Sequence, residues 1–218
     1  MADYAAMRTH MVNCQVLPNK VTDARLIAAL TEMPRELFVP TERRGVAYVD
    51  EDLEIARDRY IMEPTVLARL LQAAEAGPDD IALDIGCGTG YATALLARLA
   101  GTAVGLDEDS ALVEGASALL TELEIDNAVI VEGPLTDGFP GQAPYDVILL
   151  GGAVDRVPET ITHQLADGGR MLAVITDDGG VGKATLFVKT GEIVGARELF
   201  DAAVPPLPGF QRERSFAF

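Results

Sequence analysis

From residue 81 onward, short apolar runs alternate with amphipathic segments along the chain. The runs have the length of buried strands, and the segments between them place apolar residues at helical spacing. We therefore expect strands over 81–85, 102–107, 128–132 and 145–150, with helices over 91–100, about 109–124 and around 158–166. This alternation predicts an α/β fold with a mostly parallel sheet covered on both faces.

The end of the chain has apolar runs without helical segments between them. Asp167-Gly168-Gly169 is expected to end the preceding helix. Strands then follow over 170–176, 184–189 and 193–200. The turn Thr190-Gly191-Glu192 joins the last two strands and predicts an antiparallel hairpin at the sheet edge.

The first 60 residues precede this pattern and are expected to be mainly helical, with helices over 3–15 and 23–30 and a short element from Met33. A stronger helix over 65–76 has leucines at three positions of one face. The length of the chain favours one domain over 1–218, with an N-terminal helical cap over 1–60 and an α/β core over 61–218.

Three glycines at alternate positions, Gly86, Gly88 and Gly90, lie where the first core strand gives way to its helix. Glycine reaches positive φ without steric cost and lets a ligand approach the backbone closely. The N–H groups at a helix start favour anionic or nucleotide-like ligands. Asp84, inside the end of the strand, can take up a positively charged group. The sequence therefore predicts a cradle for part of a nucleotide-like ligand.

The spacing of this loop differs from that of a dinucleotide site. The fingerprint G-x-G-x-x-G would place its third glycine at Tyr91, which disfavours a nicotinamide dehydrogenase. A second acid, Asp107, ends the next expected strand, 17 residues beyond Gly90. An acid at an offset of roughly 20 residues accepts hydrogen bonds from ribose hydroxyls in doubly wound sheets.

Composition limits the remaining classes of function. Lys+Arg 17 against Asp+Glu 34 gives a formal net charge of -17, which disfavours nucleic acid and anionic membranes as partners. No apolar run approaches the roughly 20 residues that span a bilayer, and the N-terminus lacks the layout of a signal peptide. Cys14 and Cys87 are too few for a disulfide framework, and His10 and His163 lack metal-ligand spacing. We expect reduced thiols, no metal site and a cytoplasmic location.

The pattern D-x-G-x-G-x-G over 84–90 resembles the first motif of class I S-adenosylmethionine-dependent methyltransferases. Further motifs resemble the protein-L-isoaspartate O-methyltransferase family over nearly the whole chain. They are M-V-x-x-Q at 11–15, P-R-E-x-F-V-P at 34–40, A-Y-x-D at 47–50, A-P-Y-D-x-I at 143–148 and Q-L-x-x-G-G-R at 164–170.

The resemblance implies a doubly wound, Rossmann-like methyltransferase fold that uses S-adenosylmethionine and releases S-adenosylhomocysteine. It implies methyl transfer to the α-carboxylate of L-isoaspartyl residues in damaged proteins, so the partner is a protein or peptide. A carboxylate with a reference pKa of about 3.5 is ionised at neutral pH and needs no general base. By position, the resemblance implies cofactor contacts from Asp84, Gly86, Cys87, Gly88, Gly90, Asp107, Glu108, Gly133, Pro134 and Leu135.

The segment before the helix at 65–76 differs from the family pattern G-x-x-I-S-x-P. Met62 takes the place of the serine whose hydroxyl the family uses, and a thioether donates no hydrogen bond. By position, the candidate catalytic residues are Arg59, Tyr60, Met62 and Glu63. At 4 Å and an effective dielectric near 20, the Glu63 carboxylate would repel a substrate carboxylate by roughly 4 kcal/mol. An inward-facing Arg59 would offset that repulsion.

The adenine loop also differs, because the family's G-D-G is Gly133-Pro134-Leu135 in this chain. The resemblance and these differences together leave three hypotheses for the function. The first is an isoaspartyl methyltransferase. The second keeps the fold and the cofactor but changes the methyl acceptor, and the third is a non-catalytic, cofactor-binding or regulatory protein.

Overall fold

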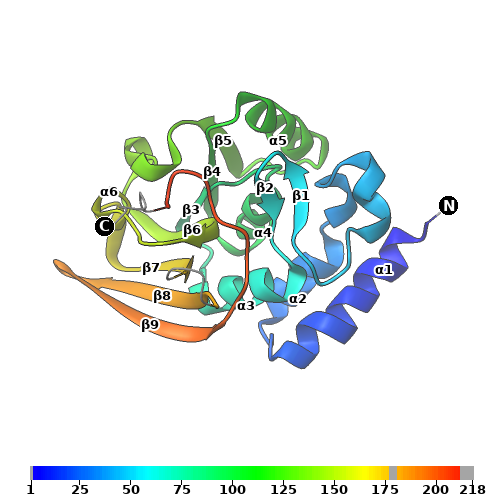
Figure 1. Ribbon diagram of the computed structural model, residues 1–218, viewed down its shortest axis with the longest axis horizontal. Helices are drawn as coiled ribbons and strands as arrows, with labels where there is room; N and C mark the ends of the chain where they lie inside the picture. Colours follow the sequence, from blue (N-terminus) through cyan, green and yellow to red (C-terminus); the bar gives the residue numbers. More distant parts are fainter. Residues whose placement is uncertain (1, 177–180, 212–218) are drawn as a thin grey trace, which may run out of the picture.

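A computed structural model of the protein describes residues 2–176 and 181–211. Within these residues, seven strands form one sheet in the order β5-β4-β3-β6-β7-β8-β9 (Figure 1). Neighbouring strands from β5 to β7 are parallel, whereas β8 and β9 are antiparallel. The strands are β3 Ile81–Ile85, β4 Thr102–Asp107, β5 Ala128–Glu132, β6 Tyr145–Val154, β7 Leu165–Ile175, β8 Lys183–Thr190 and β9 Ile193–Asp201. The mostly parallel sheet with an antiparallel C-terminal hairpin is confirmed.

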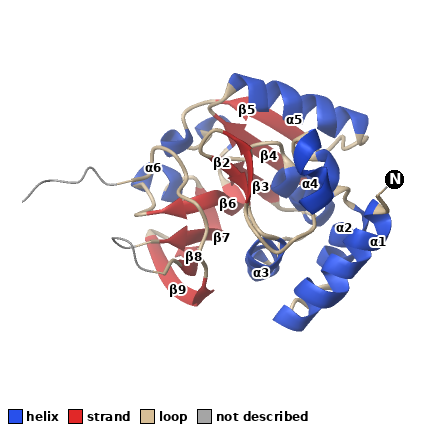
Figure 2. Ribbon diagram, turned by 45° about the vertical axis from the view of Figure 1, so that its right-hand side comes forward, coloured by secondary structure: helices blue, strands red, loops and turns tan. Residues whose placement is uncertain are grey.

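The longer helices gather on one face of the sheet (Figure 2). They are α1 Tyr4–Met11, α2 Ala24–Glu32, α3 Pro64–Ala74, α4 Tyr91–Leu99 and α5 Ser110–Glu122. Apolar residues of α3, α4 and α5 pack with inward residues of the strands, and α2 contacts α3 and α4. Burial of these apolar faces is the main stabilising contribution on this side. Among the described residues, no helix is both long and apolar enough to cross a membrane.

The second face of the sheet is covered by short elements. A separate core includes Leu83 and Leu106 from the strands, with Leu207 and Phe210 from the segment after β9. Figure 1 shows this red segment crossing from β9 toward α6. The covering elements also include α6 Glu159–Thr162 and a 3₁₀ turn at Leu135–Asp137.

The helix predicted around 158–166 is wrong. The helix α6 has only four residues, and β7 begins at Leu165. The Gln164 side chain donates to the carbonyls of Asp137 and Thr160 and accepts from the N–H of Phe139. Its backbone carbonyl accepts from Tyr145 at the start of β6. These bonds fix the chain for pairing with β6, so the helix cannot continue.

Two further boundaries differ from expectation. Gly168, expected at a helix end, lies inside β7 with a φ of +78°. The strand expected to end at residue 150 continues through Gly151 and Gly152 to Val154. A Cβ at Gly151 would lie 2.5 Å from the carbonyl oxygen of Gly86, so glycine is required where β6 approaches the end of β3.

The N-terminal region has the expected helices and one element that the sequence did not reveal. After α1 the coil continues as a π-helical turn over Val12–Val16. The unexpected element is a two-stranded antiparallel hairpin, β1 Leu53–Ala56 and β2 Arg59–Ile61. The expected boundary between residues 60 and 61 therefore falls inside β2. This hairpin, cyan in Figure 1, is packed against the glycine loop that follows β3.

Candidate active site

The glycine loop after β3 has the backbone that its spacing predicts. Gly86, Gly88 and Gly90 have φ values of +80°, +56° and +88°, and Gly90 is the N-cap of α4. The N–H groups of Gly86 and Cys87 donate to the carbonyl of Leu106 in the neighbouring strand. The loop is thus pinned to β4. What the glycines offer a ligand is chiefly space, because they have no side chains.

Asp84 lies under this loop as a fully buried acid. The Thr93 hydroxyl donates to its Oδ2 at 2.7 Å, whereas its Oδ1 has no hydrogen-bond partner in the described part of the chain. Burial raises the pKa of Asp84 to about 7. A buried acid with one unpaired oxygen on the wall of a cavity can accept a hydrogen bond from a cationic ligand group. The ammonium of a methionine moiety fits that requirement.

Asp107, at the end of β4, is also fully buried and is completely paired. The Arg59 guanidinium donates to Oδ1 at 2.6 Å and to Oδ2 at 2.5 Å. The N–H groups of Gly88 and Asp109 donate to Oδ2 and Oδ1 at 2.8 and 3.1 Å. Burial lowers the pKa of Arg59, but its hydrogen bonds and ion pair with Asp107 raise it, and the net shift is upward. The two side chains form a bidentate salt bridge.

A small cavity lies beside Asp84. Its walls combine the glycine loop, the hairpin and the end of β6, including Ile55, Tyr60, Met62, Asp84, Gly86, Cys87, Tyr91 and Gly151. The structure thus brings Tyr60 and Met62 together with the cofactor candidates Asp84, Gly86 and Cys87.

The chain's own side chains fill part of the glycine cradle. A Cβ at Gly88 would lie 2.5 Å from Cδ1 of Ile55, and one at Gly86 would lie 2.5 Å from Cδ1 of Leu207. The expected ligand of this loop and the two acids is S-adenosylmethionine. The space for it is restricted in this conformation by the hairpin and by the segment after β9.

Met62 and Glu63 lie between the hairpin and α3. Met62 is 5% exposed, and its carbonyl accepts from Nη2 of the buried Arg35 at 2.7 Å. Glu63 is the N-cap residue of α3, and its N–H donates to Asp52. Burial, together with the charges of nearby acids led by Asp50, raises the pKa of Glu63 to about 7. Glu63 therefore carries only part of a negative charge at neutral pH.

The remaining candidates lie outside the cavity. Glu108 and Pro134 are exposed, and Gly133 donates its N–H to the carbonyl of Asp107. Leu135 is 1% exposed and packs in the core of the second face. None of these four residues lines the cavity described above.

The structure adds site residues that the sequence did not single out. Thr93 supports Asp84, and it was detectable as a hydroxyl one turn into the helix that follows the loop. Ile55 and Leu207 come from distant segments and carry no local signal. No group of three or more His, Cys, Asp or Glu side chains in the described ranges could hold a metal ion.

Comparisons with known proteins show what this chain is similar to. Residues 7–201 match the family model described as protein-L-isoaspartate(D-aspartate) O-methyltransferase. A protein-L-isoaspartate O-methyltransferase of Methanoregula boonei is 38% identical over 168 residues, which cover 77% of each chain. Another, of Roseiflexus castenholzii, is 34% identical over 208 residues, covering 95% of this chain and 94% of the relative.

Solved structures show the same fold. A protein-L-isoaspartate O-methyltransferase with 26% identity has a TM-score of 0.80, covering 93% of this chain and 66% of the other. A Plasmodium falciparum chain described as the same kind of methyltransferase, in complex with S-adenosyl-L-homocysteine, has a TM-score of 0.77 at 18% identity. That alignment covers 94% of this chain and 97% of the other.

Proposed function

Because the chain belongs to the protein-L-isoaspartate(D-aspartate) O-methyltransferase family, we propose that it methylates the α-carboxylate of L-isoaspartyl residues in damaged proteins. The methyl donor is S-adenosylmethionine. The observation that carries the proposal is the family match over 7–201. Two buried acids at the ends of β3 and β4, Asp84 and Asp107, support it.

S-adenosylmethionine, when bound, supplies an electrophilic methyl group on a sulfonium. Asp84 would hold the ammonium of its methionine end through Oδ1, which lacks a protein partner. Asp107 would accept the ribose hydroxyls once Arg59 has left it. The acceptor carboxylate needs no base, so catalysis depends on alignment and on exclusion of water by the apolar wall of Ile55, Met62 and Leu67.

Glu63 repels a carboxylate acceptor less strongly than a fully ionised glutamate at this position would. With a pKa of about 7, it is substantially protonated at neutral pH. The repulsion expected for a full charge is correspondingly reduced. The place of the family serine is still taken by a buried thioether, so the acceptor lacks one hydrogen-bond donor.

A radiolabelled methyl-transfer assay tests the proposal. An isoaspartyl peptide and the same sequence with a normal aspartyl residue are compared as acceptors. Transfer to the isoaspartyl peptide alone is the expected result. Equal transfer to both peptides, or to neither while the cofactor binds, would reject the isoaspartyl acceptor.

A second candidate keeps the cofactor and changes the acceptor. It is favoured by Tyr60 and Met62, which both line the cavity. Met62 stands where the family pattern has a serine. It predicts turnover of S-adenosylmethionine with another carboxylate or small molecule and none with an isoaspartyl peptide. The non-catalytic alternative predicts cofactor binding without turnover for any acceptor. Both alternatives, like the first proposal, keep the cytoplasmic location expected from the sequence.

A further inference from the structure

The two acids of the candidate site differ in their pairing. Asp84 has an unpaired oxygen, whereas each oxygen of Asp107 accepts one backbone N–H and one guanidinium N–H. The backbone donors belong to Gly88 and Asp109 of the loops around the site, and the guanidinium belongs to the hairpin. Of these donors, only the guanidinium comes from an element outside the loops that follow β3 and β4, because the hairpin forms a separate two-stranded sheet.

The Arg59 guanidinium occupies the two Asp107 oxygens that a ribose diol would need as hydrogen-bond acceptors. A vicinal diol presents two hydroxyl donors to the two oxygens of one carboxylate, and the two Nη atoms present the same paired donors. Nη2 of Arg59 also lies 3.5 Å from the position of a Cβ on Gly86. Ile55 from the same hairpin fills the space above Gly88. Arg59 and the cofactor therefore cannot occupy Asp107 together.

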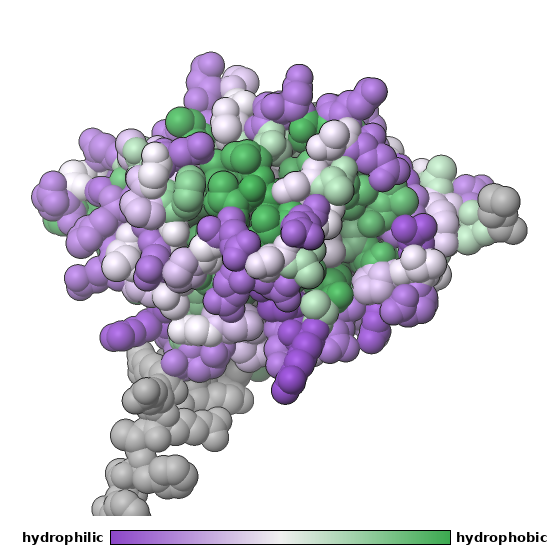
Figure 3. Space-filling view, turned by 90° about the horizontal axis from the view of Figure 1, so that it is seen from above, coloured by the Kyte–Doolittle hydropathy of each residue, from purple (hydrophilic) through white to green (hydrophobic). Residues whose placement is uncertain are grey.

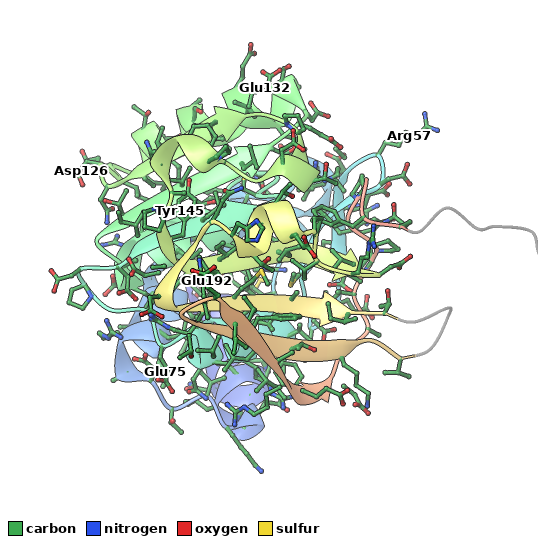
Figure 4. The ribbon with its side chains drawn as sticks, turned by 90° about the vertical axis from the view of Figure 1, so that its left-hand side faces the viewer. Arg57, Glu75, Asp126, Glu132, Tyr145 and Glu192 are labelled. Atoms are coloured by element: carbon green, nitrogen blue, oxygen red, sulfur yellow. The ribbon has the colours of Figure 1, made fainter. Side chains whose placement is uncertain are left out.

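The hairpin that carries Arg59 has few internal bonds. Its strands have four and three residues, and the pairing is irregular between Glu54 and Ala56. Isolated two-stranded hairpins are marginally stable at best, so this one depends on what it docks against. At its tip, the Arg57 side chain is 97% exposed and projects away from the molecule (Figure 4). Arg59 and the half-buried Ile55 face the site, and the buried Leu53 and Ile61 pack the base of the hairpin against the core.

We propose that Arg59 is a latch, an internal competitor for the ribose-binding acid Asp107, and that the β1–β2 hairpin must release it before S-adenosylmethionine binds. The inference rests on the proposed use of this cofactor. The closed form binds no cofactor, so the measured affinity is the affinity of the open form multiplied by the open fraction. Arg59 thus sets the cofactor concentration at which the enzyme becomes active.

Calorimetry with S-adenosylhomocysteine tests the latch in the full chain. Arg59→Gln removes the competing charge and leaves each Asp107 oxygen one backbone donor, so the acid keeps partners. We expect at least about tenfold tighter binding than in the unmodified protein, since the closed form loses its main contact. Arg57→Gln, two residues away and exposed, is the matched control and should leave the affinity unchanged.

A ligand lacking the 2′-hydroxyl separates competition at Asp107 from general loosening of the hairpin. The 2′-deoxy analogue of S-adenosylhomocysteine should gain much less from Arg59→Gln than the parent compound. Equal gains for both ligands would overturn the latch, because the substitution would then act only by opening the cavity.

Three other outcomes are decisive. Equal affinity in the unmodified protein and Arg59→Gln overturns the latch and leaves the cofactor assignment standing. No binding in any variant overturns the latch together with the cofactor on which it rests. Tighter binding by Arg59→Gln than by the unmodified protein, without methyl transfer to an isoaspartyl peptide, supports the latch and rejects only the proposed acceptor. If circular dichroism shows that Arg59→Gln is unfolded, Arg59→Lys replaces it in the test. The single ammonium of lysine cannot make the bidentate contact with Asp107, so we expect an affinity between those of the unmodified protein and of a chain without the contact. An affinity equal to that of the unmodified protein overturns the latch.

Discussion

Asp84 is a buried acid whose hydrogen bonding is incomplete in the absence of a ligand. Its carboxyl group is fully buried, and one of its oxygens has no protein donor in the described structure. Burying such a group destabilises the ionised form, which is why its pKa is raised from 3.8 to about 7. A side chain that lowers stability yet faces a cavity is typical of a binding site.

Asp84→Asn is expected to change stability and cofactor binding in opposite directions. Between about pH 4 and pH 7 the folded protein binds a proton at Asp84 that the unfolded chain has released, so the free energy of unfolding falls as pH rises through this window. Asparagine removes that loss, which is at most about 4 kcal/mol above pH 7. Affinity for S-adenosylhomocysteine should fall by about 10–100-fold, because a hydrogen bond to a charged group is lost.

Urea denaturation at pH 5 and pH 8 measures the first effect, and calorimetry measures the second. The Asn variant should differ more from the unmodified protein at pH 8 than at pH 5. An identical pH dependence in both proteins would contradict the assignment of a raised pKa to Asp84.

Met62→Ser tests whether the acceptor site is otherwise intact. Serine restores the hydroxyl donor of the family pattern at a position that is 5% exposed. Loss of the buried thioether should cost about 2–5 kcal/mol of stability. We expect higher methyl transfer to an isoaspartyl peptide than with Met62→Ala, which makes a similar cavity without a hydroxyl. Equal rates in the two variants would show that a donor at position 62 does not limit the reaction.

At the residue scale, the glycines and acids of the cofactor site could be predicted from the sequence because their spacing along one strand, loop and helix carries the signal. The partner of the Arg59 side chain could not be predicted from the sequence. The sequence put Arg59 beside Met62 as a candidate for the acceptor, whereas the structure pairs it with Asp107. A charged residue in a three-residue strand gives no periodicity from which its direction follows.

At the element scale, the core strands and helices followed from apolar periodicity, with boundaries within a few residues. The β1–β2 hairpin was missed because its strands are short and its tip, Arg57-Asp58, contains no glycine or proline. Asp58 nevertheless has a φ of +58°. The helix around 158–166 was wrong because the tertiary bonds of Gln164 outweigh the local helical pattern.

The end of α3 offers a test of local backbone conformation. Glu75 is exposed and has a φ of +48° at the helix C-terminus, where glycine is the favoured residue (Figure 4 shows its position). Glu75→Gly should raise stability by about 1 kcal/mol, which corresponds to about 2–4 °C in melting temperature. Glu75→Ala keeps the Cβ and is the control, for which no gain is expected in a thermal melt. A gain with alanine alone would contradict the backbone explanation.

At the scale of the whole molecule, charge is the dominant property. The formal net charge is -17, and hydrophilic residues surround the apolar patches on the face seen in Figure 3. Such a surface attracts basic peptides at long range and repels acidic ones. The acids around Glu63, which raise its pKa, place part of this field at the acceptor side of the site.

Peptide charge should therefore control the apparent affinity for the acceptor. For an isoaspartyl peptide with three flanking lysines, KM should rise by roughly 2–10-fold between low and physiological salt, because the attraction is screened. The same peptide with glutamates in place of the lysines should show a falling KM. Initial rates at several salt concentrations measure both, and parallel changes in the two peptides would contradict an electrostatic origin.

The ion pair between Arg59 and Asp107 also affects the rate of ligand association. When a site is blocked by the protein's own side chain, ligand association waits for that side chain to leave. The observed rate of S-adenosylhomocysteine binding should then level off at high ligand concentration, at the opening rate of the hairpin, where stopped-flow traces reveal it. Loop and lid motions of this kind occur on roughly microsecond to millisecond scales. Removal of Arg59 should restore a rate that rises linearly with concentration.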